Sequence, residues 1–216
     1  MKSNFDKTFK MLDNYYSNLF IKYGNSVKTS QQSSRATQKK RMEILTNDIS
    51  FTKKDKILDF GCGTGFFLNF IKKKKNFHGY YYGCDISKKI IDFNKKRNKD
   101  PKVFFFCKNI LKSNLSISYD YIFINGTFNN KTRNNYSWMK EILNLLFLKT
   151  KKKIIFNNLS KYVDYKDKNL FYADPLVIFD FCKKKLSKNV SIDHSYFIKK
   201  NVIPFEFTTT VSKKSK

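Results

Sequence analysis

The chain has few of the residues that build metal sites, disulfide frameworks or membrane spans. Its 216 residues include only four cysteines, two histidines, three prolines and seven glycines. The cysteines show no C-x-x-C spacing and no accompanying histidine cluster, so the sequence suggests neither a zinc site nor a disulfide framework. The longest apolar run, ILNLLFL at 142–148, is far shorter than the roughly 20 residues that cross a bilayer.

The N-terminus also lacks the continuous apolar core of a signal peptide. We therefore expect a soluble, cytoplasmic protein with no metal and no membrane association. A chain of this length can bury about 70% of its unfolded surface in one compact domain. Within it, we expect residues 1–48 to form a helical cover over a main domain of residues 49–216.

Acidic residues are scarce beside basic ones, with 17 Asp and Glu against 44 Lys and Arg and a formal net charge of +27. The lysines come in dispersed runs at 72–75, 151–153 and 183–185, next to expected helix ends or strand starts, where solvated charge is common. The wider bias toward Asn, Phe, Tyr and Ile is one that A/T-rich codons produce. We expect nonspecific polyanion binding at low salt. A nucleic-acid substrate is a less favoured alternative to a small-molecule acceptor.

Apolar runs alternate with helical patterns along most of the chain, which is typical of a doubly wound α/β sheet. Two amphipathic helices come first, one ended by Gly24 and one over 37–47. Strands are expected near 56–60, 78–84, 102–107, 119–125, 152–157, 189–197 and 204–211, and further helices near 64–74, 87–97, 136–148 and 175–186. The last two strands have no helix between them, which predicts an antiparallel hairpin.

The most informative segment is ILDFGCGTGFF at 57–67, an apolar strand that carries Asp59 into Gly61, Gly63 and Gly65. Glycines there allow a positive φ and a close approach of backbone to ligand, and the next helix begins with free N–H groups. The segment YYYGCDIS at 80–87 is a second expected strand that ends at Asp85, twenty residues after Gly65. Nucleotide-binding folds place a ribose-binding carboxylate at this position. The alternative for Asp85 is a helix N-cap, and a NAD dehydrogenase would place an acid here too.

The spacing D-x-G-x-G-x-G differs from the G-x-G-x-x-G of dinucleotide folds and resembles motif I of the class I S-adenosylmethionine (SAM)-dependent methyltransferases. The resemblance extends over nearly the whole chain, to a small subgroup with an N-G-T-F segment, here 125–128. It implies a Rossmann-like seven-stranded sheet with helices on both faces, an antiparallel C-terminal hairpin and an N-terminal helical cover. It also implies SAM as the cofactor. Further matching segments are SSRATQKKRMEIL at 33–45, FNNLSKYVDYKD at 156–167 and YADPLVIFDF at 172–181.

The resemblance also assigns roles at the cofactor site. Asp59 is expected near the cofactor's amino group, and Asn109 is expected to accept a hydrogen bond from the adenine amino group. Arg41 and Gln38 lie on one helical face, and an arginine is a good bidentate partner for the methionine carboxylate; a surface guanidinium is the alternative. The full expected set is Gln38, Arg41, Asp59, Gly61, Cys62, Gly63, Thr64, Gly65, Asp85, Ile86, Asn109, Ile110, Asn125 and Gly126.

Candidates for acid, base or positioning work are His194, Asn125 and Tyr165. Methyl transfer needs few catalytic residues, because aligning the nucleophile with the methyl group supplies most of the rate. For His194 the alternative is a hydrogen-bonded histidine at a sheet edge. Asn125 lacks the Pro-Pro-aromatic neighbours of amino methyltransferases that act on bases.

The sequence thus predicts an enzyme that moves a methyl group from SAM to an oxygen or nitrogen of a small metabolite, such as a sugar or a carboxylic acid. One alternative is an RNA or other nucleic-acid methyltransferase. Another is a pseudo-enzyme that keeps a SAM pocket for structure or sensing, although Asp59, the three glycines and Asp85 are all retained.

Overall fold

The structure, a computed structural model, describes residues 5–200 and 202–213. The strands are β1 (Lys56–Phe60), β2 (Tyr80–Asp85), β3 (Val103–Cys107), β4 (Tyr119–Ile124), β5 (Thr150–Ser160), β6 (Tyr172–Ala173), β7 (Asn189–Asp193) and β8 (Glu206–Ser212). The helices are α1 (Asp6–Tyr23), α2 (Arg35–Leu45), α3 (Phe66–Lys74), α4 (Lys88–Arg97), α5 (Asn135–Leu148) and α6 (Pro175–Phe181), with a 3-10 turn η2 (Val27–Ser30) and a π turn η3 (Cys182–Leu186).

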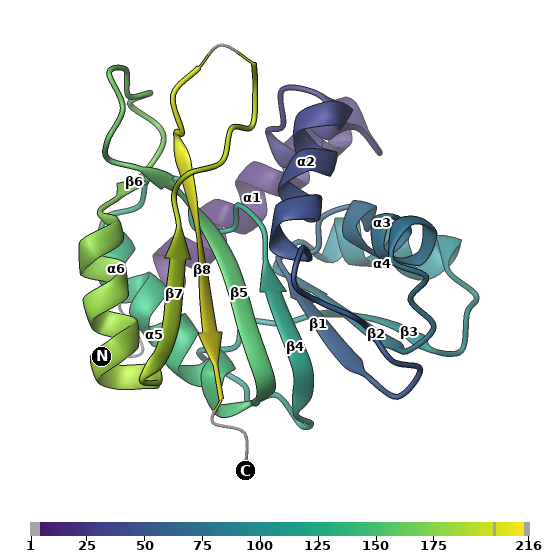
Figure 1. Ribbon diagram of the computed structural model, residues 1–216. Helices are drawn as coiled ribbons and strands as arrows, with labels where there is room; N and C mark the ends of the chain where they lie inside the picture. The colour runs from purple at the N-terminus through teal and green to yellow at the C-terminus, as the bar shows by residue number, and fades with distance from the viewer. Residues whose placement is uncertain (1–4, 201, 214–216) are drawn as a thin grey trace.

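The strands form one sheet in the order β3-β2-β1-β4-β5-β8-β7, with the short β6 paired to β5 (Figure 1). Strands β1 to β5 are parallel, and β8 runs antiparallel to both β5 and β7. The expected α/β sheet with an antiparallel C-terminal hairpin is therefore confirmed. The additional strand β6 is only two residues long, which is too short to leave a periodic pattern in the sequence.

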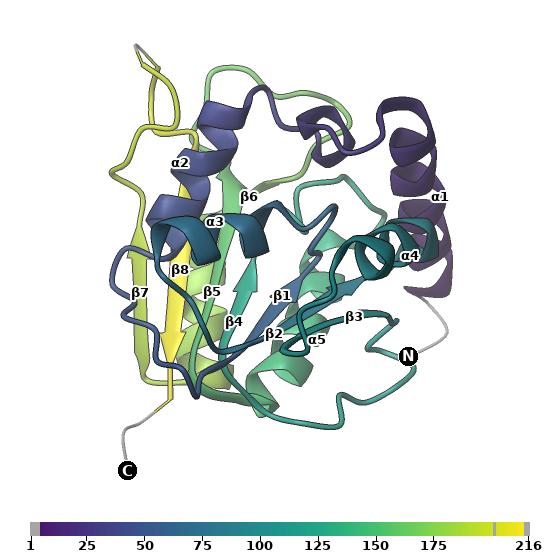
Figure 2. The same ribbon diagram turned by 90° about the vertical axis from the view of Figure 1, so that its right-hand side faces the viewer.

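Helices cover both faces of this sheet, and strand alternation decides which side chains meet them. On one face α1, α5 and α6 pack over Leu58 and Ile122. On the other face α2, α3 and α4 pack over Ile57 and Phe123, and Figure 2 shows these three helices in front of the sheet. Because successive side chains of a strand point to opposite faces, Asp59 lies on the same face as Ile57. That face carries the glycine turn into α3.

The carboxyl ends of β1, β2, β3 and β4 meet at one edge of the sheet. Helix α1, η2 and α2 lie above this edge (Figure 1). Helix α1 ends where expected, because Gly24 at φ +56° donates its N–H to the carbonyl of Phe20. Helix α2 begins two residues before the expected Thr37, because Ser34 and Thr37 form a reciprocal capping box that fixes the start at Arg35.

Two further boundaries differ from expectation for local reasons. The expected helix over 175–186 begins as predicted, with Asp174 as N-cap and Pro175 in the first turn, but its last part winds as the π turn η3. The expected strand over 189–197 stops at Asp193, whose carboxylate accepts hydrogen bonds from the backbone N–H and the hydroxyl of Ser195 and turns the chain. In the described part of the chain, every helix is too short or too polar to cross a membrane.

Candidate active site

A cavity of about 810 Å³ opens at the carboxyl edge of the parallel strands. Its floor comes from the ends of β1 and β2, one wall from the loop after β4, and its roof from α1 and from residues 26–34, which we call the strap. Residues 161–171 and the segments 194–200 and 202–205 stand at its outer side. Its volume lies in the range of small-molecule sites.

The floor is a glycine turn whose backbone strains any larger residue. Gly61 has φ +80°, and a Cβ there would lie 2.1 Å from the hydroxyl oxygen of Thr127. Gly63 has φ +49°, and a Cβ there would lie 3.3 Å from the hydroxyl oxygen of Ser30 in the strap. Both positions are left-handed backbone that glycine tolerates best. The turn therefore lets Thr127 and the strap residue Ser30 approach the backbone of the floor closely.

Asp85 is held in place by two backbone amides. Its Oδ2 accepts from the N–H of Gly63 at 3.0 Å, and its Oδ1 accepts from the N–H of Ser87 at 3.0 Å. Burial raises the pKa of Asp85, and the amide bonds oppose that rise. The N-cap of α4 is Ser87 rather than Asp85. Asp85 lines the cavity with a fixed carboxylate whose remaining lone pairs are free to accept hydrogen bonds from a ligand.

Asp59 lies beneath the turn and is outside the cavity lining. Its carboxylate is 2% exposed and accepts a hydrogen bond of 2.5 Å from the hydroxyl of Tyr81. Burial raises the pKa of Asp59 to about 7, the charge of Asp85 adds to the rise, and the Tyr81 bond opposes it. The expected contact with the cofactor's amino group stays a prediction, because the structure places a buried acid here that supports the turn from below.

We expect Asp59→Asn to stabilise the protein in alkaline buffer. The folded chain keeps a proton on Asp59 up to about pH 7, whereas the unfolded chain loses it near pH 3.8. Asp59 therefore does not lower the free energy of unfolding below pH 3.8. As the pH rises from 3.8 through 7, that free energy falls by on the order of 4 kcal/mol. Asparagine carries no charge and can still accept from Tyr81. Urea unfolding at pH 5 and pH 8.5 should show a clearly larger gain for the variant at the higher pH, because most of the loss falls between pH 5 and about pH 7.

The control for this prediction is Asp92→Asn on α4, where the carboxylate lies at the surface and pairs with Lys88. That variant should leave the difference in unfolding free energy between the two pH values nearly unchanged. Equal or lower stability of Asp59→Asn at pH 8.5 would mean that the buried carboxylate is tolerated as an anion.

Arg41 reaches the cavity but is already paired. Its guanidinium donates to both carboxylate oxygens of Glu206 on β8, and to the side-chain oxygen of Gln32 in the strap. Glu206 is buried and also accepts from Asn157 on β5. The guanidinium is mostly buried in this internal ion pair rather than free at the surface, and its expected bidentate contact with a methionine carboxylate stays a prediction. The pair ties α2 and the strap to the last strand.

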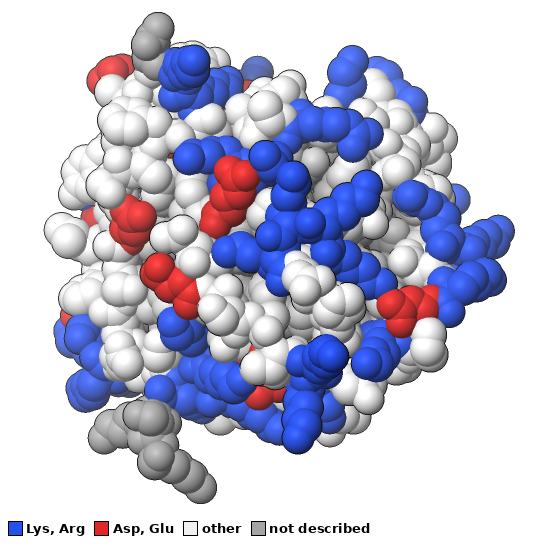
Figure 3. Space-filling view, turned by 45° about the vertical axis from the view of Figure 1, so that its right-hand side comes forward, with Lys and Arg blue, Asp and Glu red and all other residues white. Residues whose placement is uncertain are grey.

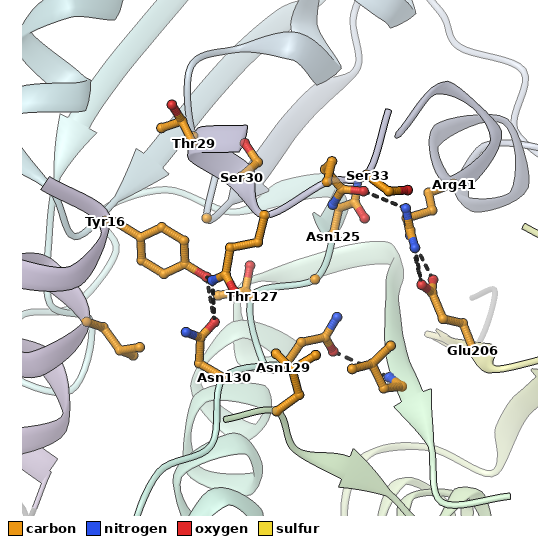
Figure 4. A pocket seen from close by; sticks show the side chains of 18 of the residues that line it. Tyr16, Thr29, Ser30, Ser33, Arg41, Asn125, Thr127, Asn129, Asn130 and Glu206 are labelled. Carbon is orange, nitrogen blue, oxygen red and sulfur yellow. Dashed lines mark hydrogen bonds and ion pairs between the residues drawn. The ribbon is translucent and has the colours of Figure 1, made fainter. Parts of the chain in front are cut away.

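Neutral amide and hydroxyl groups form the inner wall (Figure 4). Tyr16 on α1 donates its hydroxyl to the side-chain oxygen of Asn130 at 2.7 Å, and Gln31 donates to the same oxygen at 3.1 Å. Figure 4 shows Arg41 and Glu206 facing each other on the opposite side, with Asn125 between the two pairs. The side-chain oxygen of Asn125 is buried without a hydrogen-bond partner.

The sequence pattern of the family described as a methyltransferase domain matches residues 51–197. The protein Rv1506c of Mycobacterium tuberculosis, named as a methyltransferase, is 30% identical over 170 residues, covering 74% of this chain and 93% of its own. The chain belongs to the class I SAM-dependent methyltransferases. The expected enzyme class and cofactor are thereby confirmed.

Solved structures share the fold of this methyltransferase at low sequence identity. Magnesium protoporphyrin IX methyltransferase from Synechocystis PCC 6803, solved with S-adenosylhomocysteine (SAH), has a TM-score of 0.67 at 12% identity, covering 97% of this chain and 100% of its own. A SAM-dependent methyltransferase from Clostridium acetobutylicum ATCC 824 has a TM-score of 0.60 at 14% identity, covering 92% and 98%. These likenesses concern the fold alone.

Half of the sequence-predicted site residues of this methyltransferase line the cavity, and half do not. Those that line it are Arg41, Gly61, Gly63, Asp85, Ile86, Asn125, Gly126 and Tyr165, the last on an exposed loop at the mouth. Those outside the lining are Gln38, Asp59, Cys62, Thr64, Gly65, Asn109, Ile110 and His194.

Asn109 and His194 lie outside the cavity lining, and their expected roles stay predictions. The side-chain oxygen of Asn109 accepts from the backbone N–H of Leu111 at 3.0 Å and so closes a local turn after β3. His194 packs its ring against Phe207 and Tyr162, 5.8 Å and 6.2 Å away between centroids. Both side chains therefore lie where they contribute to local structure, and the structure does not bring His194 to the cavity.

Several lining residues of the methyltransferase were missed by the sequence reasoning. The strap reads as a polar linker, yet residues 29–33 all line the cavity. Tyr16 occupies a helical core position in the sequence pattern, and Glu206 begins the last strand. The one sequence signal that could have marked Glu206 is its position as a lone acid in the apolar segment PFEFTTTV.

Proposed function

We propose that this enzyme holds SAM between the glycine turn and the strap and transfers its methyl group to an oxygen or nitrogen of a small metabolite. The observation that carries the proposal is the fixed carboxylate of Asp85 beside the space over Gly61 and Gly63. A ribose offers two adjacent hydroxyls, and a carboxylate with free lone pairs is their natural partner. The residues present therefore fit a nucleoside-bearing cofactor.

The chain's own groups bind, orient and exclude water. SAM, when bound, supplies a methyl group on a positively charged sulfur, which is the electrophile of the reaction. Asp85 orients the nucleoside, Ile86 offers an apolar edge beside it, and the strap shields the turn from solvent. Holding two reactants in line in a shielded space converts a bimolecular step into an effectively unimolecular one. The hydrogen bonds of Asn130 with Tyr16 and Gln31 keep the roof in position.

Supplying SAM with pools of small metabolites and following SAH formation tests this proposal. A metabolite pool that yields SAH together with one methylated product supports it, and each active pool can be divided until the acceptor is identified. SAH binding without turnover in any pool would instead favour the pseudo-enzyme alternative. Among the candidates for acid, base or positioning work, Tyr165 and Asn125 line the cavity, whereas His194 does not.

A nucleic-acid substrate would bind through basic residues near the cavity, so the position of the Lys and Arg residues relative to the cavity tests this alternative. Helices α3 and η3 lead into β2 and β7, so the lysine runs 72–75 and 183–185 lie at the edge where strands begin, and 151–153 opens β5 itself. This is the edge opposite the cavity. Figure 3 shows Lys and Arg spread over much of one face, with a further group along its lower edge. Such a distribution favours a small acceptor.

We expect RNA binding to be weak, indifferent to sequence, and to fade steeply between about 50 and 200 mM salt, because counterion release sets its affinity. Methyl transfer from labelled SAM to total RNA should be absent even at low salt, since Asn125 lacks the Pro-Pro-aromatic neighbours that hold an extruded base in place. Transfer that survives about 150 mM salt and is lost in Asn125→Ala would replace the metabolite proposal with the RNA one.

A further inference from the structure

A chain of hydrogen bonds joins the strap to the loop after β4. We call it the relay, and its members are Gln32, Arg41, Glu206, Asn157 and the backbone N–H of Gly126. We propose that Asn157 and Gln32 are positioning residues of this methyltransferase, which set its affinity for the cofactor through the relay. The inference rests on the proposed function and adds to it a residue, Asn157, that lies outside the cavity lining.

The relay runs from the roof of the cavity to its wall. The Arg41 guanidinium donates to the side-chain oxygen of Gln32, and its Nε lies 2.9 Å from each carboxylate oxygen of Glu206. The side-chain nitrogen of Asn157 donates to Oε2 of Glu206 at 3.1 Å, and Oδ1 of Asn157 accepts from the N–H of Gly126 at 2.8 Å. Each member therefore holds the next, from the strap to the wall.

Both ends of the relay lie beside the glycine turn. Gln32 is two residues after Ser30, which lies over this turn. Gly126 precedes Thr127, whose hydroxyl donates to the carbonyl of Phe60 at the end of β1, at 3.0 Å. The relay thus fixes the roof relative to the wall, on two sides of the space in which we propose that the nucleoside binds.

The middle of the relay is buried and fully paired. Glu206 and Asn157 are each 1% exposed, and Asn157 uses both polar atoms of its side chain within the relay. A buried ion pair often adds no stability over packed apolar groups, because both charges must leave water. A buried network whose groups are all paired does, however, make the parts that it joins rigid. The relay therefore serves geometry more than stability.

The strap is held on two opposite sides of the cavity, and the relay is one of these two supports (Figure 4). Gln31 donates to Asn130 on one side, and the next residue, Gln32, accepts from Arg41 on the other. A break in the relay leaves the first support in place. We therefore expect such a break to weaken cofactor binding without abolishing it.

Asn157→Leu tests the wall end of the relay. Leucine neither donates to Glu206 nor accepts from Gly126, and position 157 is outside the cavity lining, so the substitution leaves the ligand space untouched. We expect SAH to bind about tenfold more weakly in a calorimetric titration. Thermal unfolding of the same samples should show that the variant is folded at the temperature of the titration.

Asn158→Leu is the matched control for Asn157→Leu. Asn158 is the next residue on β5, is also 1% exposed and also lies outside the cavity lining. Its side chain points to the opposite face of the sheet, where its nitrogen lies 3.6 Å from the sulfur of Met139. The control thus makes the same chemical change at the same depth without breaking the relay. We expect its SAH affinity to stay within about twofold of the parent value.

Two substitutions of Gln32 test the strap end. Gln32→Met removes the acceptor for Arg41, whereas Gln32→Glu keeps an acceptor there. We expect the methionine variant to bind SAH about tenfold more weakly and the glutamate variant to stay within about threefold of the parent. Because both ends belong to one relay, the double variant Gln32→Met/Asn157→Leu should be no weaker than about twofold below the weaker single variant. Independent effects would multiply to about a hundredfold.

The outcomes separate this inference from the proposed function. Parent SAH affinity in folded Asn157→Leu, an equal loss in Asn158→Leu, or multiplied losses in the double variant would each overturn the positioning role while the cofactor site stands. If Asn157→Leu fails to fold, the Gln32 variants decide: restored affinity in Gln32→Glu supports the relay, and equal losses in both variants overturn it. Failure of the parent protein to bind SAH would overturn the proposed function itself.

Discussion

Replacing Gly63 by valine is expected to abolish binding of SAM and SAH while leaving the domain folded. The backbone at Gly63 has φ +49°, and a Cβ already comes within 3.3 Å of the Ser30 hydroxyl oxygen. The two further methyl groups of valine would fill the space between turn and strap that the cofactor needs. The left-handed backbone costs a non-glycine residue roughly 1–2 kcal/mol, which is less than the stability of an ordinary domain. Calorimetric titration with SAH measures the loss.

Gly24→Val is the matched control for Gly63→Val. Gly24 has φ +56° and no atom within 4 Å of an added Cβ, and it lies outside the cavity lining. It therefore also places valine at a positive φ, with its own backbone cost, without touching the ligand space. We expect a lower melting temperature and unchanged SAH affinity for Gly24→Val. Unchanged SAH affinity in Gly63→Val as well would refute the assignment of the glycine turn as the cofactor floor.

The second large effect is expected at Asp85, which we propose holds the ribose diol. A charge-assisted hydrogen bond contributes about 1.5–3 kcal/mol, so Asp85→Ala should weaken SAM and SAH by more than about tenfold. The variant also removes the acceptor for the amides of Gly63 and Ser87, which loosens the turn. Fluorescence or calorimetric titration gives the affinity for SAM and SAH. Thermal unfolding of the same samples gives the loss of stability caused by the loosened turn.

Asp92→Ala, seven residues further on the surface of α4, serves as the control and should keep the parent affinity. If Asp85→Ala lowers the melting temperature but keeps SAM affinity within about twofold, Asp85 serves the turn alone. The ribose would then have to be held elsewhere in the cavity.

The sequence predicted the fold well because the relevant signals are local. Apolar run length and glycine spacing predict the strand over 56–60, the positive-φ glycines and the helix after them. The structure has β1 at the expected residues, and α3 begins two residues later than expected. The hairpin of β7 and β8 follows from two strands without a helix between them. Asp85 could be placed beside the turn because parallel neighbours end at the same edge.

The parts of the site that could not be predicted depend on partners distant in sequence, on local competition for hydrogen bonds, or on segments without a periodic pattern. Arg41 and Glu206 are 165 residues apart, and only the docking of α2 over β8 brings them together. Asn109 was expected to reach the adenine, but a nearby N–H at Leu111 competes for its oxygen. The strap has no periodic pattern of apolar residues that would predict its place in the fold. Its role as the roof of the cavity follows from the position of Ser30 over Gly63 in the structure.

A crystal structure of the protein grown with SAH tests the central claim most directly. We expect the nucleoside between Gly63 and the strap, with both ribose hydroxyls within hydrogen-bond distance of the Asp85 carboxylate and the sulfur directed toward Asn125. SAH bound outside this cavity, or bound within it with its ribose away from Asp85, would contradict the account.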